Sequence, residues 1–246
     1  AWPADAAWPR LRADIAIQAE RDRQMALAEQ AWSRVPAGAR AARADWQASF
    51  LRVAASRSSR ASVAPELGAF VAAHPEDAGM RRLAIEAWAE AGQPLRALDA
   101  YGPLLGADAS AADVRRAADL ARQGAAAAPA RALLSRLVSM PGARTADVWA
   151  LAEVLAADRD AAGLRTLLAS PLADDDACAT RLVSVVLAYG DEGLLADLVP
   201  MLPASCATHA MVAGRMARVL VARNRPADAE HSPDPLWRPH RLDAEG

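Results

Sequence analysis

The feature that most constrains this sequence is a series of turn-forming residues that recurs with a period of about 34 residues. Each of them is small or polar, and each interrupts a chain that is otherwise rich in alanine and leucine. They are Ser58, Gly92, Gly124, Asp158, Gly190 and Asn224, and the differences between successive numbers are 34, 32, 34, 32 and 34. A period of this length is typical of arrays in which one supersecondary unit repeats along the chain.

Apolar residues stand at fixed distances from these turn residues. Nine positions after the first five turns lies a column that we predict to be buried: Leu67, Tyr101, Leu133, Leu167 and Val199. Four positions before the six turns lie Ala54, Trp88, Leu120, Val154, Val186 and Leu220, and seven before lie Leu51, Ile85, Ala117, Leu151, Val183 and Ala217. Spacings of three and four residues place these columns on one helix face. Each unit is therefore predicted to be a helix pair that stacks on its neighbours.

Composition agrees with helices and excludes several functions. Alanine, leucine, arginine and glutamate favour helices, and no alternating run of β-branched residues predicts a strand. The formal net charge of −2 provides no field to attract nucleic acid, and no apolar run approaches the roughly 20 residues of a membrane-spanning helix. Because the chain begins with Ala1, we expect a processed chain or a piece of a longer one.

One unit carries residues that point to a known family. The unit at 77–110 has two aromatic residues, Trp88 and Tyr101. It also has a glycine between its helices, Gly92, and a small residue where the helices cross, Ala97. This unit resembles the tetratricopeptide repeat (TPR), whose period fits better than the roughly 40–47 residues of HEAT and armadillo repeats. The resemblance implies an all-α, right-handed superhelix (an α-solenoid) of about five to six helix-turn-helix repeats. Pro129 and Gly163 stand where this unit has Ala97, so those units depart from the family's pattern.

Both ends of the chain depart from the repeat. Residues 10–33 are predicted to form one long amphipathic helix that pairs with a helix at about 38–57 or caps the stack. We therefore divide the chain into an N-terminal segment with a capping helix (1–37), TPR-like repeats (38–230) and an extended proline-rich tail (231–246). The tryptophans on first helices, Trp46, Trp88 and Trp149, are predicted to lie in the core. The tryptophans in the proline-rich ends, Trp2, Trp8 and Trp237, are predicted to dock either on the chain itself or on a partner.

Motifs for catalysis, cofactors and metals are missing from the sequence. It lacks glycine-rich phosphate loops, a GxSxG turn and an HExxH zinc motif. His231, His240 and Asp234 share the tail, but their spacing matches no zinc signature. The acidic run 174–176 precedes a predicted helix, where carboxylates cap free N–H groups. We therefore expect no catalytic residue, no metal and no cofactor.

The TPR resemblance implies a binding surface, because first helices usually line the concave face that holds the ligand in this family. The charged residues placed on that face are Arg52, Arg82, Glu86, Glu90, Arg122 and Arg218. Scattered charges among alanines suit an extended or helical peptide close to the backbone; the alternative is that they are ordinary solvated residues. We expect a protein or peptide partner and no nucleic acid.

Two functions fit these observations. The first is a non-catalytic interaction scaffold, and the resemblance points to bacterial envelope assemblies, including polysaccharide-export machinery. The alternative is a helical-repeat domain of a larger enzyme, such as a superhelical murein transglycosylase, which would need a catalytic glutamate in a deep cleft. We expect a periplasmic location, with the cytoplasm as the alternative.

The only cysteines, Cys178 and Cys206, bear on the compartment. In the repeat register, Cys178 starts a first helix and Cys206 follows the second helix of the same unit. Antiparallel helices would bring the two thiols to one end of the unit, within reach of a disulfide that suits an oxidising compartment. The alternative is a pair of unrelated buried thiols.

Overall fold

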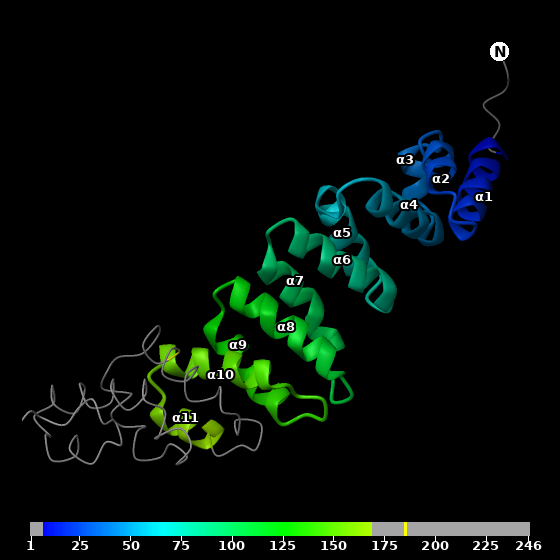
Figure 1. The fold of residues 1–246 in the computed structure, drawn as a ribbon. Coiled ribbons are helices and arrows are strands. Elements are labelled where there is room, and N and C mark those ends of the chain that lie inside the picture. Colours follow the sequence, from blue (N-terminus) through cyan, green and yellow to red (C-terminus); the bar gives the residue numbers. More distant parts are fainter. Residues whose placement is uncertain (1–6, 169–184, 186–246) are drawn as a thin grey trace, which may run out of the picture. The chain divides into compact units, whose positions relative to one another are not determined.

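The computed structural model describes residues 7–168 and Val185, which are mostly helical (Figure 1). These residues form eleven α-helices and two short 3-10 helices, and no strand occurs among them. The predicted all-α fold class is confirmed. None of the described helices has both the length and the apolar character needed to cross a membrane. The chain divides into two compact units, Ala1–Ala126 and Ala127–Gly246.

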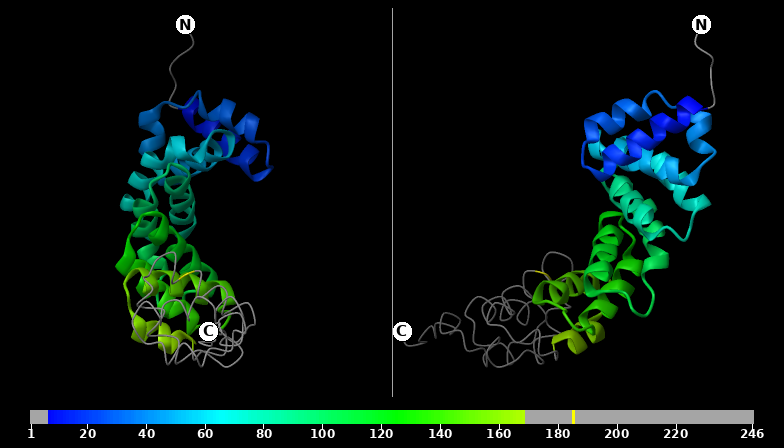
Figure 2. Two further views of the ribbon diagram at one scale, coloured as in Figure 1. Left: turned by 60° about the vertical axis from the view of Figure 1, so that its left-hand side comes forward. Right: turned by 90° about the vertical axis from the view of Figure 1, so that its right-hand side faces the viewer.

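Unit 1 is a succession of helices that pack on their neighbours in the sequence. Its elements are α1 (Ala7–Arg21), α2 (Met25–Trp32), α3 (Ala37–Ala41), α4 (Ala44–Arg57), η1 (Arg60–Val63), α5 (Ala64–Ala73), α6 (Ala78–Glu90), α7 (Pro94–Tyr101), η2 (Gly102–Leu104) and α8 (Ala111–Gln123). We call α1, α4, α6 and α8 the first helices, because each ends next to a turn of the repeat, near Arg23, Ser58, Gly92 or Gly124. α1 contacts α4 and α4 contacts α6, so these three first helices adjoin in order (Figure 2).

Unit 2 contains α9 (Ala127–Val138), α10 (Thr145–Ala157) and α11 (Ala161–Leu168), and α10 packs on both of the others. Arg131 on α9 forms ion pairs with Asp158 and Asp160 in the turn between α10 and α11. These ion pairs fasten α9 to that turn.

Four helices end in the same turn geometry, marked by a residue with a left-handed backbone. These residues are Arg23 (φ 59°), Gly92 (φ 68°), Ala125 (φ 52°) and Arg159 (φ 56°). In each turn the N–H of the following residue donates to the carbonyl five positions before it, at 2.8 or 2.9 Å. This arrangement is the Schellman motif, which satisfies carbonyl groups that a helix end leaves free.

The turn residues predicted from the sequence lie one position early in two of these turns. Gly124 has φ −84° and Asp158 has φ −77°, and the left-handed residues that follow them are Ala125 and Arg159. At Gly92 the glycine itself is left-handed, as predicted. The other predicted turn residues are Ser58, which is extended, and Gly190 and Asn224, which lie outside the described residues.

Counting from the left-handed residue corrects the counterparts of Ala97 by one position. Five positions after Gly92, Ala125 and Arg159 lie three buried residues, which are Ala97, Ala130 and Leu164. Pro129 and Gly163 are therefore not the counterparts of Ala97. Most described members of the predicted columns on the first helices are buried, namely Leu51, Ile85, Trp88, Ala117, Leu120 and Leu151. Ala54 and Val154 are half-buried. The remaining members, Val183, Val186, Ala217 and Leu220, lie outside the described residues.

One described member of the column on the second helices differs from the prediction. Leu67, Tyr101 and Leu167 are buried as predicted. Leu133 is only half-buried, while its neighbour Leu134 is 2% exposed. The prediction for Leu133 is wrong: at this point of α9 the buried residue is Leu134, nine positions after the left-handed Ala125. Val199 lies outside the described residues.

The N-terminal segment contains two helices where the sequence predicted one over 10–33. α1 ends at Arg21, a turn with left-handed Arg23 follows, and α2 begins at Met25. The single helix predicted at about 38–57 is divided as well, because α3 ends at Ala41 and α4 begins at Ala44.

An aromatic cluster forms the core around α2 and α4. Trp32 is fully buried, and its ring centroid lies 6.4 Å from those of both Trp46 and Phe50. Its indole Nε1 has no hydrogen-bond acceptor in the described part of the chain. The predicted core residues Trp46, Trp88 and Trp149 are buried, and Trp8 is 44% exposed; Trp2 and Trp237 lie outside the described residues.

The left-handed alanine makes a stability prediction possible. We expect Ala125→Gly to raise the free energy of unfolding by about 1 kcal/mol, because glycine adopts a positive φ without the steric cost that a Cβ adds. Gly92→Ala is the converse change and is expected to lower it by about 1 kcal/mol. Urea unfolding followed by circular dichroism measures both, and a destabilised Ala125→Gly variant would contradict the assigned turn.

Candidate functional site

Two clefts of unit 1 lie along three first helices. One cleft, of about 430 Å³, lies between α1 and α4 and is lined by residues including Ile17, Glu20, Arg21, Asp45 and Ser49. A second, of about 320 Å³, lies between α4 and α6 and is lined by residues including Ala55, Ser56, Arg60, Gly79 and Leu83. Both clefts are also lined by Arg52 and Asp77, so they adjoin, and we call the two clefts together the first-helix groove.

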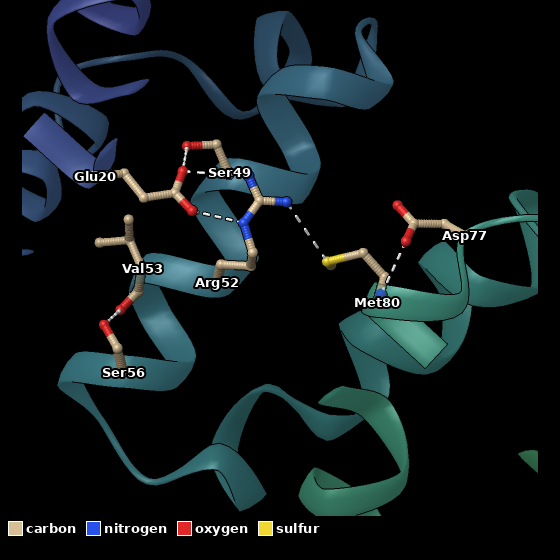
Figure 3. A network of polar contacts seen from close by, with 7 residues as sticks. All are labelled: Glu20, Ser49, Arg52, Val53, Ser56, Asp77 and Met80. Atoms are coloured by element: carbon tan, nitrogen blue, oxygen red, sulfur yellow. Dashed lines mark hydrogen bonds and ion pairs between the residues drawn. The ribbon is translucent and has the colours of Figure 1, made fainter. Parts of the chain in front are cut away.

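Arg52 lies at the centre of the groove and joins its three helices (Figure 3). Its Nε and Nη2 donate to the carboxylate of Glu20 on α1, at 2.5 and 3.2 Å, and the hydroxyl of Ser49 donates to the same carboxylate. Its Nη1 lies 4.0 Å from the sulfur of Met80 on α6. The Glu20 side chain is 14% exposed, so this forked pair is partly shielded from water and stronger than a solvated one.

The other carboxylates of the groove also accept hydrogen bonds. Asp77 caps the start of α6, because its side chain accepts the backbone N–H of Met80 at 2.9 Å. Asp45 accepts from Arg43 at 2.9 and 3.2 Å, and this hydrogen bond lowers the pKa of Asp45 below its ordinary value. The acidic side chains of the groove are thus engaged in helix capping and ion pairs.

The predicted partner-binding residues differ in their surroundings in the structure. Arg52 lines the groove. Three others form ion pairs between helices: Arg82 with Asp113 at 2.8 Å, Glu86 with Arg116 at 3.1 Å, and Glu90 with Arg60 at 3.1 Å. Arg122 is exposed on α8 and is also engaged in a contact, while Arg218 lies outside the described residues.

Asp113 is the centre of a second polar cluster, between α6, α7 and α8. It accepts hydrogen bonds from Arg82 at 2.8 Å, from the Ser110 hydroxyl at 2.8 Å and from the Tyr101 hydroxyl at 3.3 Å. The hydrogen bond from Arg82 lowers the pKa of Asp113, against the opposing effect of burial. Burial, and then the charge of Asp113, raise the pKa of Tyr101. The cluster holds the start of α8 against α6 and α7, which is a structural role.

Sequence reasoning missed Glu20, Ser49, Asp77 and Gly79 as groove residues. A signal for some of them is present, because opposite charges about one period apart meet in space. Glu20 precedes its partner Arg52 by 32 residues, and Arg60 precedes Glu90 by 30 residues. Ser49 and Gly79 carry no such signal, since their place in the groove depends on how neighbouring helices pack.

The described residues contain no group of three or more histidine, cysteine or acidic side chains that could hold a metal ion. The candidates that the sequence offered elsewhere, Cys178, Cys206, His231, His240 and the acidic run 174–176, lie outside the described residues. The groove is therefore a partly apolar surface with the ion pair of Arg52 and Glu20 at its centre.

Comparison with known proteins does not assign the chain to a family. No protein-family model matches the sequence, and no curated protein matches it closely enough to count as a relative. Its function is therefore inferred from the groove itself.

Proposed function

We propose that this chain is a non-catalytic scaffold that binds a protein or peptide partner along the first-helix groove. The proposal includes stacking of the helix pairs as a TPR-like right-handed superhelix and a setting in the bacterial envelope. The observation that carries it is the groove's path over α1, α4 and α6, with Arg52 and Asp77 shared by its two clefts. A hollow that crosses successive helices suits an elongated ligand better than a compact one.

The lining of the groove supports a peptide ligand. Small residues, Ala48, Ala55 and Gly79, let a second backbone approach, and Ile17 and Leu83 offer apolar contacts. Each cleft is near the lower end of the roughly 300–1,000 Å³ that enclose small ligands. Together they suit several side chains of one extended or helical segment, which is a recurring mode of peptide recognition.

The carboxylates of the groove favour a scaffold over the enzyme alternative. A general acid or base needs a carboxyl group that is available to the substrate proton. Glu20 is engaged by Arg52 and Ser49, Asp45 by Arg43, and Asp77 by the start of α6. Each carboxylate is therefore engaged in stabilising the fold.

A glycine in the groove allows the proposal to be tested. Gly79 is exposed at the second cleft, and a Cβ added there would meet only the Asp77 carboxylate, at 3.3 Å. Gly79→Trp should fill the cleft without disturbing the core. Peptides selected by display against the full chain are expected to bind this variant at least tenfold more weakly, measured as Kd by fluorescence anisotropy.

Gly38→Trp is the matched control, because Gly38 on α3 has open space around it and does not line the groove. It should bind the selected peptides like the unmodified chain, and both variants should keep their circular dichroism and Tm. The proposal fails if no peptide is selected, or if Gly79→Trp binds as tightly as Gly38→Trp.

A further inference from the structure

The charges that line the first-helix groove are paired, with two exceptions. The ion pairs are Glu20–Arg52, Asp45–Arg43 and Arg60–Glu90. The remaining charged residues of the lining are Arg21 and Asp77. Within the described part of the chain, neither of these two side chains forms an ion pair. They are therefore the charges of the groove that are available to a ligand.

Both unpaired charges line the cleft between α1 and α4. Arg21 is the last residue of α1 and is exposed. Asp77 precedes α6 and is half-buried, and one of its oxygens accepts the backbone N–H of Met80 at 2.9 Å. Its other oxygen accepts no hydrogen bond from the residues drawn in Figure 3. The cleft thus has a positive charge at the end of α1 and a negative charge at the start of α6.

Apolar side chains in the same cleft increase the effect of these charges. Ile17 and Ala48 also line it. A ligand that packs on them displaces water from the cleft, and a charge that loses water without gaining a partner is unfavourable. A ligand that brings an opposite charge avoids this cost, because attraction between charges strengthens as water is excluded. The two unpaired charges therefore discriminate between ligands of similar shape.

We propose that the groove binds a peptide segment that carries both signs of charge, with an acidic side chain against Arg21 and a basic side chain against Asp77. This inference rests on the proposed function and adds which peptides bind and in which direction they lie. The two groove charges have opposite signs and belong to different helices. Reversing the segment would therefore bring like charges together, which complementary interfaces avoid.

Reversing the charge of Arg21 tests the acidic position of the ligand. Peptides selected by display against the full chain are expected to bind Arg21→Glu about tenfold more weakly, measured as Kd by fluorescence anisotropy. Replacing the peptide's acidic residue by arginine should restore the Kd for this variant to within about threefold. Arg34→Glu is the matched control, because Arg34 is an exposed arginine after α2 that does not line the groove. It should bind the selected peptides like the unmodified chain.

Neutralising Asp77 tests the basic position. Asp77→Asn removes the charge, while asparagine still caps a helix as aspartate does, so the Tm should stay unchanged. Replacing the peptide's basic residue by alanine should weaken binding to the unmodified chain about fivefold. The same replacement should have little effect on binding to Asp77→Asn.

The outcomes separate this inference from the proposed function. The proposed function fails if no peptide is selected or if Gly79→Trp binds the selected peptides normally. The charge assignment alone is overturned if Gly79→Trp weakens binding but Arg21→Glu binds as tightly as Arg34→Glu. It is also overturned if the arginine-substituted peptide does not recover its affinity for Arg21→Glu. Circular dichroism of each variant shows whether it is folded.

Discussion

Truncation of Leu134 to alanine is expected to lower the free energy of unfolding by about 2–5 kcal/mol, the usual range for a packed leucine. Leu134 is 2% exposed on α9, nine positions after the left-handed Ala125. Leu133→Ala is the matched control, and it should cost about 1 kcal/mol or less because Leu133 is only half-buried. Urea unfolding followed by circular dichroism compares the two variants directly.

The two adjacent leucines discriminate between two registers of the helix pair. If Leu133→Ala proved more destabilising than Leu134→Ala, the buried residue would be the one nine positions after Gly124 and not the one nine positions after Ala125. The corrected register would then be wrong. Equal losses would also contradict it, since Leu134 is 2% exposed whereas Leu133 is only half-buried.

Trp32→Ala is expected to cost about 3–5 kcal/mol, because it empties the centre of the aromatic cluster. Trp32→Phe should cost clearly less. It keeps an aromatic ring beside Trp46 and Phe50, and it removes an indole N–H that has no acceptor in the described part of the chain. An unpaired buried donor carries a desolvation cost of about 1–3 kcal/mol, which the phenylalanine avoids.

Thermal and urea unfolding of the two Trp32 variants measure this difference, with Leu27→Ala as a control on the exposed side of α2. The control should lose less than about 1 kcal/mol. Equal losses for Trp32→Phe and Trp32→Ala would show that Nε1 finds a partner that compensates its burial.

The helical fold could be predicted from the sequence because apolar residues follow the helical period over long stretches. The register could not, and Gly124 shows why. A Cβ at Gly124 would come within 2.5 Å of the Leu95 side chain on α7, so this glycine allows close packing and is not the left-handed residue. A glycine at a helix end therefore has two possible causes, and only the tertiary contact distinguishes them.

The break between α1 and α2 could be predicted only from the period. Asp22, Arg23 and Gln24 include no glycine or proline, and Arg23 adopts φ 59° despite its Cβ. Gln24, inside this turn, lies one repeat period before Ser58. The repeat thus marks a turn that local propensity does not.

The predicted site was limited by the same kind of long-range information. Charged residues on first helices could be identified, but whether each faces a ligand or a neighbouring helix depends on pairing across the fold. Arg82 and Glu86 meet Asp113 and Arg116 on the next first helix, so their charges are already neutralised. Arg52 lies in the groove because α1 and α6 leave space on both sides of it.

The ion pair between α1 and α4 also bears on how such a chain can change in evolution. Arrays of similar units readily gain or lose one unit by unequal recombination. Glu86 lies one repeat period after Arg52, so loss of one unit that begins at Arg52 would place the Glu86 carboxylate where the Arg52 guanidinium now meets Glu20. Two like charges would then share one partly buried position, which is unfavourable. The sign of the Glu86 charge would therefore make a chain that lacks this unit less stable.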